Sequence, residues 1–273
     1  MVDDVVQQRT AAELRASYAE HGYLVVADLL TRADIARLRA ALADVLKDAE
    51  GLTEIDERFF VAVGEDGTPA VTRVRNPVAH HHAFRELVTF PRLLDLIDTI
   101  IGPNLQFVHS KINLKPPRNR EAAYPWHQDW PFNPHTNLDM LAVMIPLDDA
   151  DEQNGCLRVI SGSHKYGPVD HRYGGYFCVK DETLVEDRSR HVSLVVPAGG
   201  VALYHCCLLH SSTANFGAAS RNAIFFDYRA ADNVQLGGAT GPHRGLLVRG
   251  VDPLSVRMMP GTFTVRDTPR RPA

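Results

Sequence analysis

The sequence Leu141-Ala142-Val143-Met144-Ile145-Pro146-Leu147 is one of several short β-rich runs that decide the fold. Glycine, proline, asparagine and aspartate separate these runs, as is typical of strands joined by turns. The other runs cover residues 105–114, 156–160, 192–196, 201–206 and 222–228. Regularly spaced strands with turn signals predict a sandwich or barrel rather than alternating strand–helix units.

The chain before this β-rich part has mainly helical patterns. Thr10-Ala11-Ala12-Glu13 has the form of a capping box and Gly22 is a stop signal, which predicts a helix over residues 11–21. A second helix is expected from residue 32 until Gly51, and a third helical segment, residues 83–101, has a break at Pro91. Residues 23–27 and 70–75 read as strands. We expect this part to be a flank packed on the core.

Composition limits the class of protein. The chain has 273 residues, of which 45% are hydrophobic and 23% are charged, as in ordinary soluble domains. A net charge of −4 argues against a nucleic-acid binder, and no apolar run is long enough to span a bilayer. The four cysteines show no C-x-x-C pair and the N-terminus no secretory pattern, so we expect a reducing, cytoplasmic setting.

The stretch Tyr124-Pro125-Trp126-His127-Gln128-Asp129-Trp130 precedes the opening run and carries candidate metal ligands. If it forms a strand, alternation places His127 and Asp129 on one face, where both reach one metal ion. His210, in a later β-rich region, can supply a third ligand. Two histidines and one carboxylate with open coordination positions describe the facial triad of non-haem Fe(II) oxygenases.

Plainer interpretations of these residues stay open. H-x-D is short and occurs by chance, so His127 and Asp129 also fit an ordinary half-buried strand. His205 is a rival third ligand. It lies an odd number of residues from His210, so a continuous strand would place the two on opposite faces. We favour His210 and expect His205 to be a core or supporting imidazole.

Several motifs together resemble the phytanoyl-CoA dioxygenase family of Fe(II)- and 2-oxoglutarate-dependent oxygenases. They are Lys115-Pro116-Pro117, His127-Gln128-Asp129, Asn154-Gly155-Cys156-Leu157, Ser161-Gly162-Ser163-His164-Lys165, and His210-x-Ser212-x-x-Asn215 followed by Arg221. The resemblance implies a mainly β fold with flanking helices, built on a double-stranded β-helix, the cupin-like jelly roll. We expect one domain, with a helical flank at about 1–104, a jelly-roll core at about 105–235 and a C-terminal extension at 236–273.

The resemblance also implies roles for individual residues. His127, Asp129 and His210 would hold Fe(II), and Arg221, helped by Ser212, would bind the distal carboxylate of the co-substrate 2-oxoglutarate. A guanidinium suits that task because it binds a carboxylate through two nitrogens. Arg73, Lys111, Gln128 and Met144 fall among further cofactor contacts. Trp130, Phe132 and Tyr176 are candidates for the substrate wall, although each also fits ordinary packing.

The activity implied is O2-dependent hydroxylation of an unactivated C–H bond in a small molecule, with release of succinate and CO2. The substrate class stays open among secondary metabolites, acids and acyl thioesters, as does the oligomeric state, monomer or homodimer. Asp129 fills the position that related halogenases leave free for halide, so hydroxylation is favoured over halogenation. Desaturation, epimerisation and ring formation use the same triad. A non-catalytic jelly-roll binding module and a metal enzyme without 2-oxoglutarate are the alternatives from other classes.

The long polar segment over residues 167–190 has two interpretations. Long loops in compact domains are often functional, which predicts a mobile cover over the site. An ordered surface insertion fits equally well.

Overall fold

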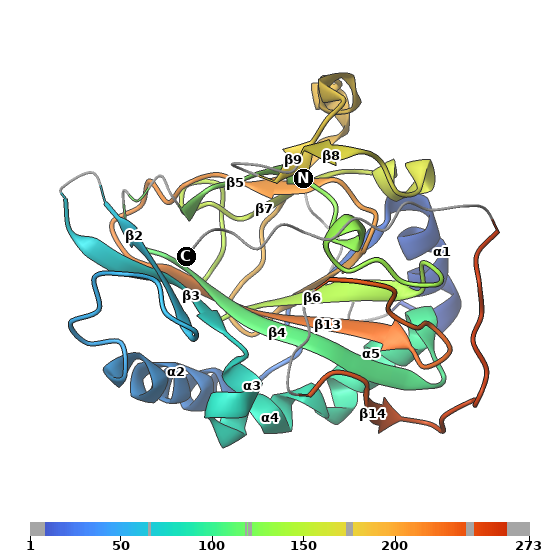
Figure 1. Ribbon diagram of the computed structural model, residues 1–273, viewed down its shortest axis with the longest axis horizontal. Coiled ribbons are helices and arrows are strands. Elements are labelled where there is room, and N and C mark those ends of the chain that lie inside the picture. Colours follow the sequence, from blue (N-terminus) through green and yellow to red (C-terminus); the bar gives the residue numbers. More distant parts are fainter. Residues whose placement is uncertain are drawn as a thin grey trace.

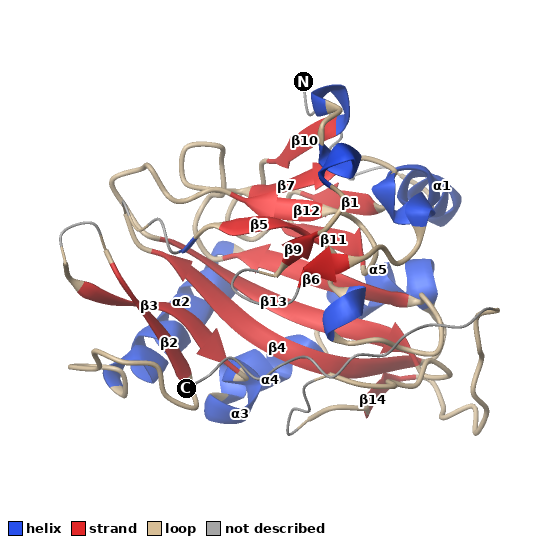
Figure 2. Ribbon diagram, turned by 45° about the horizontal axis from the view of Figure 1, so that its top comes forward, coloured by secondary structure: helices blue, strands red, loops and turns tan. Residues whose placement is uncertain are grey.

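The protein is described here by a computed structural model that covers residues 9–64, 67–117, 119, 122–172, 177–238 and 243–260. Two antiparallel sheets face each other in its centre (Figures 1 and 2). Helices cover the other side of the larger sheet. This is the predicted jelly roll with flanking helices.

The larger sheet has eight strands. In spatial order these are β1 (Tyr23–Val26), β11 (Val201–His205), β6 (Met140–Pro146), β13 (Arg221–Ala230), β4 (Leu105–Lys115), β3 (Pro69–Arg75) and β2 (Phe59–Val63), with β14 (Leu246–Arg249) also pairing with β4. The long pair β4–β13 forms its centre, and all its pairings are antiparallel.

The smaller sheet lies over the inner face of the larger one (Figure 1). Its four strands, in order, are β10 (His191–Leu194), β7 (Leu157–Ile160), β12 (His210–Ser212) and β5 (Tyr124–His127). A separate two-stranded hairpin consists of β8 (His171–Arg172) and β9 (Cys178–Val179). All six β-rich runs predicted from the sequence are strands of these sheets, with ends shifted by up to a few residues.

The flanking helices also follow their sequence signals. They are α1 (Ala11–His21), α2 (Arg32–Lys47), α3 (Pro77–His80), α4 (His82–Val88) and α5 (Pro91–Ile101). Thr10 and Thr31 each form a complete capping box, which satisfies free N–H groups at the helix start. Gly22 ends α1 with φ of 82°, a left-handed conformation that glycine adopts without strain. Pro91 begins α5, as the predicted break indicated.

Alternation along β4 and β13 separates two cores. Ile112, Ile224 and Phe226 face outward and pack in the larger cluster with the helices. Ala223 and Phe225 face inward, between the sheets. This inner face therefore presents the intervening odd-numbered residues of β13 to the interior of the barrel.

The predicted division into flank, core and extension stays a prediction, and the structure adds detail to it. The flank is not only helical, because β1, β2 and β3 extend the larger sheet. Residues 246–249 of the extension form β14 beside β4. The segment over residues 167–190 contains the β8–β9 hairpin and two short 3₁₀ helices, Glu182–Val185 and Arg188–Arg190. Among the described residues, no helix has the length and apolar character needed to cross a membrane.

Candidate metal centre and co-substrate site

Two imidazoles face each other in the smaller sheet. His127 ends β5 and His210 begins β12, and the two are directly paired across the ladder, with ring centroids 4.1 Å apart. His127 Nδ1 lies 2.7 Å from the carbonyl of Pro125, and His210 Nδ1 lies 2.9 Å from that of Leu208. A carbonyl only accepts, so each Nδ1 carries the proton and each Nε2 keeps a free lone pair. Both rings are thus oriented as metal ligands.

Asp129 reaches the same place by a different route from the one expected. β5 ends at His127, and Asp129 lies beyond it with helical dihedrals (φ −78°, ψ −33°), so strand alternation does not position the carboxylate. Instead the backbone N–H groups of Asp129 and Trp130 both donate to the carbonyl of Cys206, at 3.0 Å each. The turn after β11 therefore holds the carboxylate ligand in position.

The ligand atoms of the triad converge. Asp129 Oδ1 lies 3.7 Å from His210 Nε2, and one ligand atom from each of His127, Asp129 and His210 lies within 4.8 Å of the others. Asp129 Oδ2 is buried and has no hydrogen-bond partner. A buried carboxylate oxygen without a partner is costly unless a cation binds it. The arrangement fits a divalent metal held on one face.

Burial and neighbouring charges set the protonation of these ligands. Burial lowers the pKa of His127 well below its usual value, with a further contribution from His210, and burial also lowers the pKa of His210. Burial alone would raise the pKa of Asp129, but His210 and Lys111 outweigh it, so the pKa is lowered. Neutral imidazoles and an ionised carboxylate are the forms that bind a metal.

His205 lies outside this triad. It ends β11 in the larger sheet, so His205 and His210 do not share the continuous strand that the alternation argument assumed. Its Nδ1 accepts a hydrogen bond from the N–H of Cys207 at 3.0 Å. The ligand atoms of His205, Cys206 and Cys207 also lie within 4.8 Å of one another, but neither ring nitrogen of His205 is a buried atom without a partner.

The predicted co-substrate arginine is buried at the start of β13. Arg221 is 2% exposed, and Nη2 donates to the carbonyl of Gly155. Its Nε and Nη1 are buried and have no partner. Burial lowers the pKa of Arg221 to about 10, which leaves it charged near neutral pH. These unpartnered N–H groups are charged donors that can pair with a carboxylate.

The smaller sheet connects this arginine to the metal ligands. Tyr124 starts β5 and pairs with Ser212 on β12, while His127 ends β5 and pairs with His210. Tyr124 is also close enough to Arg221 to influence its pKa. Three residues of strand span roughly 10 Å, so one end of these strands carries the metal ligands and the other carries the co-substrate candidates.

Lys115 is a residue of this region whose role the sequence did not reveal. It is 1% exposed, and Nζ donates to the carbonyls of Ala122 and Thr213. Burial, followed by the charge of Arg221, lowers the pKa of Lys115 to about 6. The Lys115-Pro116-Pro117 motif marked its position, but the motif alone does not reveal a buried amine beside an arginine.

Three other predicted cofactor contacts lie on the inner face of the larger sheet. Arg73 donates from Nε to Asn113 Oδ1 at 3.1 Å and from Nη2 to the hydroxyl of Tyr124 at 2.8 Å. Lys111 lies near enough to the triad for its charge to lower the pKa of Asp129. Met144 is 1% exposed and packs in the inter-sheet core. Their roles toward a cofactor stay predictions.

Gln128, predicted as a cofactor contact, forms hydrogen bonds with protein groups. It is fully buried, and Nε2 donates to the carbonyls of Gly167 (2.9 Å) and Cys207 (2.7 Å). Its Oε1 accepts from the N–H of Val169 at 2.9 Å, and its own N–H donates to His171 Nε2. This geometry fixes the start of the 167–190 segment beside the triad, which favours the ordered insertion over a mobile cover at that point.

The predicted substrate-wall residues have different surroundings. Phe132 lies near the metal ligands, with its ring centroid 6.1 Å from that of His127 and 3.5 Å from that of Phe177. Trp130 is buried with Met140 and the two adjacent cysteines. Tyr176 lies outside the described residues. The structure therefore adds Phe177, which the sequence interpretation missed because the contact depends on the β8–β9 hairpin folding over β5.

Known proteins resemble this chain throughout. The family model described as phytanoyl-CoA dioxygenase (PhyH) matches residues 18–223. A probable alpha-ketoglutarate-dependent hypophosphite dioxygenase of Stutzerimonas stutzeri is 33% identical, over 93% of this chain and 91% of its own. The peroxisomal phytanoyl-CoA dioxygenase of Rattus norvegicus is 30% identical over a region that covers 81% of this chain and 68% of the rat protein. The structure of EctD from S. alaskensis with bound Fe, 24% identical, covers 96% of this chain and 90% of its own with a TM-score of 0.69 and shares the fold.

Proposed function

This chain belongs to the phytanoyl-CoA dioxygenase (PhyH) family, and from that premise we propose which of its residues bind iron, co-substrate and substrate. The protein is an Fe(II)- and 2-oxoglutarate-dependent dioxygenase that acts on a small molecule. When bound, iron and 2-oxoglutarate activate O2 for oxygen transfer to the substrate, with release of succinate and CO2. The protein's own residues bind, orient and desolvate these reactants.

His127, Asp129 and His210 are the proposed iron ligands. The convergence of three ligand atoms within 4.8 Å is the observation that carries this assignment. The unpartnered Oδ2 of Asp129 and the two Nδ1–carbonyl hydrogen bonds support it independently. Three protein ligands leave coordination positions open for the keto acid and O2.

Arg221 is the proposed partner of the distal carboxylate of 2-oxoglutarate. Its two unpartnered nitrogens leave N–H donors free for a carboxylate, and Ser212 offers a hydroxyl on β12 of the smaller sheet. Lys115 lies beside Arg221, but its lowered pKa of about 6 leaves the amine neutral near neutral pH, so Arg221 carries the positive charge of this end. The chemistry of the cluster favours a dicarboxylate with one end at the metal and the other at Arg221.

Phe132 and Phe177 are the proposed wall on the substrate side. Both rings lie about equally far from His127, at 6.1 and 6.2 Å between centroids, and they pack against each other. An apolar cover of this kind excludes water from the reacting atoms. The occupied position at Asp129 favours hydroxylation over halogenation.

The small-molecule substrate is best sought among compact polar compounds. The Stutzerimonas stutzeri relative, named for hypophosphite, matches nearly all of both chains, whereas the rat relative matches 68% of its own length. This difference supports testing small acids and phosphorus oxyanions before long acyl thioesters. Succinate formation above the substrate-free rate would identify the substrate class.

An anaerobic binding titration tests the assignment. We would add Fe(II) and then 2-oxoglutarate to the wild type, His210→Ala and Arg221→Gln, and follow the visible absorption that appears when a keto acid chelates Fe(II). We expect no band in His210→Ala. In Arg221→Gln we expect the same band, but only at a much higher co-substrate concentration.

Exposed residues of the same types serve as matched controls. His80→Ala and Arg188→Gln replace exposed side chains outside the site and should titrate like the wild type. Unchanged iron binding in His210→Ala would refute the ligand set. Unchanged 2-oxoglutarate affinity in Arg221→Gln would instead show that another residue binds the distal carboxylate.

A further inference from the structure

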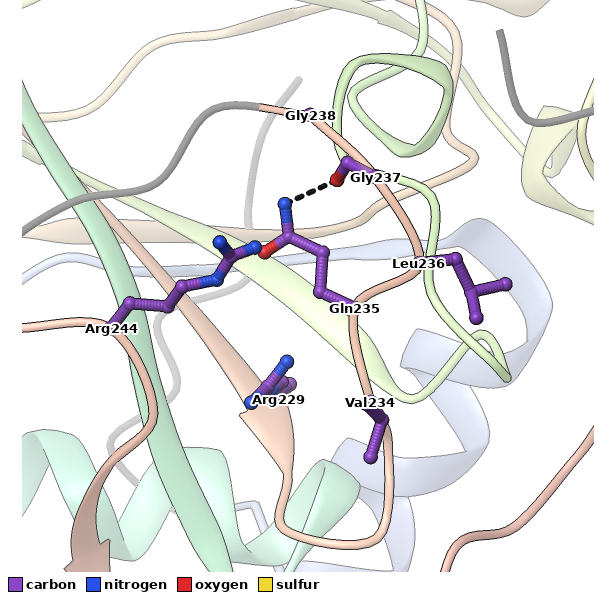
Figure 3. Close-up of a pocket in the computed structure, with 7 residues that line it drawn as sticks. All are labelled: Arg229, Val234, Gln235, Leu236, Gly237, Gly238 and Arg244. Carbon is purple, nitrogen blue, oxygen red and sulfur yellow. Dashed lines mark hydrogen bonds between the residues drawn. The ribbon is translucent and has the colours of Figure 1, made fainter. Parts of the chain in front are cut away.

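A cationic pocket lies at the end of β13 opposite Arg221. It has a volume of about 400 Å³ and is lined by Arg229, Arg244 and the loop over residues 234–238. Figure 3 shows Arg229 projecting from its strand below the loop, while Arg244 reaches toward the side chain of Gln235 from the opposite wall. None of the lining residues is acidic.

Arg229 is buried without a counter-charge. It is 8% exposed, and Nε and Nη2 donate to Gln106 Oε1 at 3.1 and 2.8 Å. Its Nη1 is buried and has no hydrogen-bond partner. Among the described residues, no ion pair involves either Arg229 or Arg244. Burial and the charge of Arg244 lower the pKa of Arg229 to about 10, which leaves it charged.

Such an arrangement is unfavourable unless an anion completes it. A buried charge is normally paired, and two like charges facing one pocket repel each other. An oxyanion between the guanidinium groups would remove both costs and satisfy Nη1 of Arg229. Planar, forked donors select carboxylate and phosphonate groups in particular.

The walls of the pocket pack on segments next to the metal centre. The loop over residues 234–238 packs on the segment that follows Asp129: the N–H of Leu236 donates to the carbonyl of Pro134 at 2.8 Å, and the backbone of Gly238 lies against Phe132. On the other wall, Arg229 is two residues beyond Asp227 on the inner face of β13. The charge of Asp227 reaches the metal centre, since it contributes to the pKa of His210.

We propose that this pocket binds the anionic group of the substrate, a carboxylate or phosphonate, while the atom to be oxidised lies at the metal. The inference rests on the proposed function and adds a substrate class to it. Because two strand residues span roughly 7 Å, a substrate that passes Asp227 to reach Arg229 carries its charge several bonds from the oxidised atom. An ion as small as hypophosphite does not span this distance.

Calorimetric titration with methylphosphonate tests the pocket directly, at constant ionic strength and with Fe(II) and 2-oxoglutarate present. We expect binding to the wild type and a dissociation constant at least about tenfold higher in Arg244→Gln, because a charged donor is lost. Arg188→Gln removes an exposed arginine elsewhere and should bind like the wild type. Arg244 is partly exposed, so Arg244→Gln is the variant expected to fold. Arg229→Lys, which keeps the charge but loses the forked geometry, is the second variant.

Turnover distinguishes a substrate group from a free anion. Among compounds that stimulate succinate formation, those with a carboxylate or phosphonate should show a raised KM and a nearly unchanged kcat in Arg244→Gln. Methylphosphonate should compete with them. No binding of methylphosphonate, equal binding by all variants, or stimulation instead of competition would overturn the proposal.

The two proposals fail in different ways. Loss of the proposed function would appear as an absent keto-acid band in the wild type, whatever methylphosphonate does. If only the pocket proposal fails, the keto-acid band will be present, but Arg244→Gln will bind methylphosphonate no more weakly than the wild type does.

Discussion

The two ends of β13 each carry a buried arginine, and their contrast shows what an unpaired guanidinium means. Arg221 and Arg229 are eight residues apart on one inner face, and each has buried N–H groups without partners. Burial lowers the pKa of a neighbour at each end, Lys115 beside Arg221 and His135 beside Arg229, and the arginine charges lower it further. Only the first arginine belongs to a recognisable motif. The physical signature of an anion site is nevertheless present at both.

Asp129→Ala should have the largest effect on activity. It should disrupt the metal centre and leave the anion pocket at Arg229 intact. Without the carboxylate ligand the iron is lost, and we expect substrate-stimulated succinate formation to fall on the order of 10³-fold or more. 2-Oxoglutarate should bind weakly because chelation is lost, while methylphosphonate binding near Arg229 should persist. Calorimetry with both ligands measures this, and parallel loss of both would show that the ends are not independent.

Replacing each arginine by lysine tests whether 2-oxoglutarate binding needs its forked guanidinium. Arg221→Lys keeps the charge but not the fork, so we expect the KM for 2-oxoglutarate to rise about tenfold. Arg229→Lys should leave that KM within about twofold, because it lies at the opposite end of the strand. Steady-state assays at varied 2-oxoglutarate give both values. An equal rise in the two variants would contradict the division of the strand into two anion sites.

The lowered pKa of Lys115, beside Arg221, should make the stability of the protein depend on pH. The native state binds its proton only below pH about 6, while the unfolded chain holds it up to its ordinary pKa of 10.5. The unfolded state therefore binds more protons between these values, and stability rises with pH across that window. Lys115→Met should flatten the slope by up to about 1.4 kcal/mol per pH unit between pH 6.5 and 8. Denaturant unfolding at several pH values measures the slope, and an unchanged slope would refute the buried neutral amine.

The buried imidazole of His135, at the Arg229 end, should cause a smaller pH dependence of stability, in a lower pH range. It is fully buried, and burial with the charges of Arg229 and Arg244 lowers its pKa to about 4. The unfolded chain gains the proton below about 6.5, so stability falls as pH drops from 6.5 to 4. His135→Gln should reduce this acid sensitivity, by up to about 1.4 kcal/mol per pH unit. The exposed His82→Ala variant is the control, and equal acid sensitivity in both variants would contradict the prediction.

The local features of the fold were predictable because they depend on short-range patterns. Short β-rich runs between turn residues marked the strands, and the capping box at Thr10 marked a helix start. The short strand β2 was missed, and β12 was recognised only as a β-rich context for His210. Both depend on pairing with distant partners rather than on their own composition.

The candidate site was predictable only in part, for a related reason. The identity of the triad residues follows from motif order, and the structure brings the three together. The reason given for the position of Asp129 was wrong, because the carbonyl of Cys206, far along the chain, positions it and not strand alternation. Gln128 carried no signal that it would bind the 167–169 backbone.

The sequence by itself determined the kind of chemistry. It specified an imidazole–carboxylate–imidazole set, a candidate co-substrate arginine and a series of short strands, because these depend on residue type and local pattern. The tertiary structure alone decided which buried charges remain unpaired. Arg229, Arg244 and the loop over residues 234–238 meet only when the loop packs on the segment after Asp129. Pairing of charges is a property of distant contacts, so no local pattern encodes it.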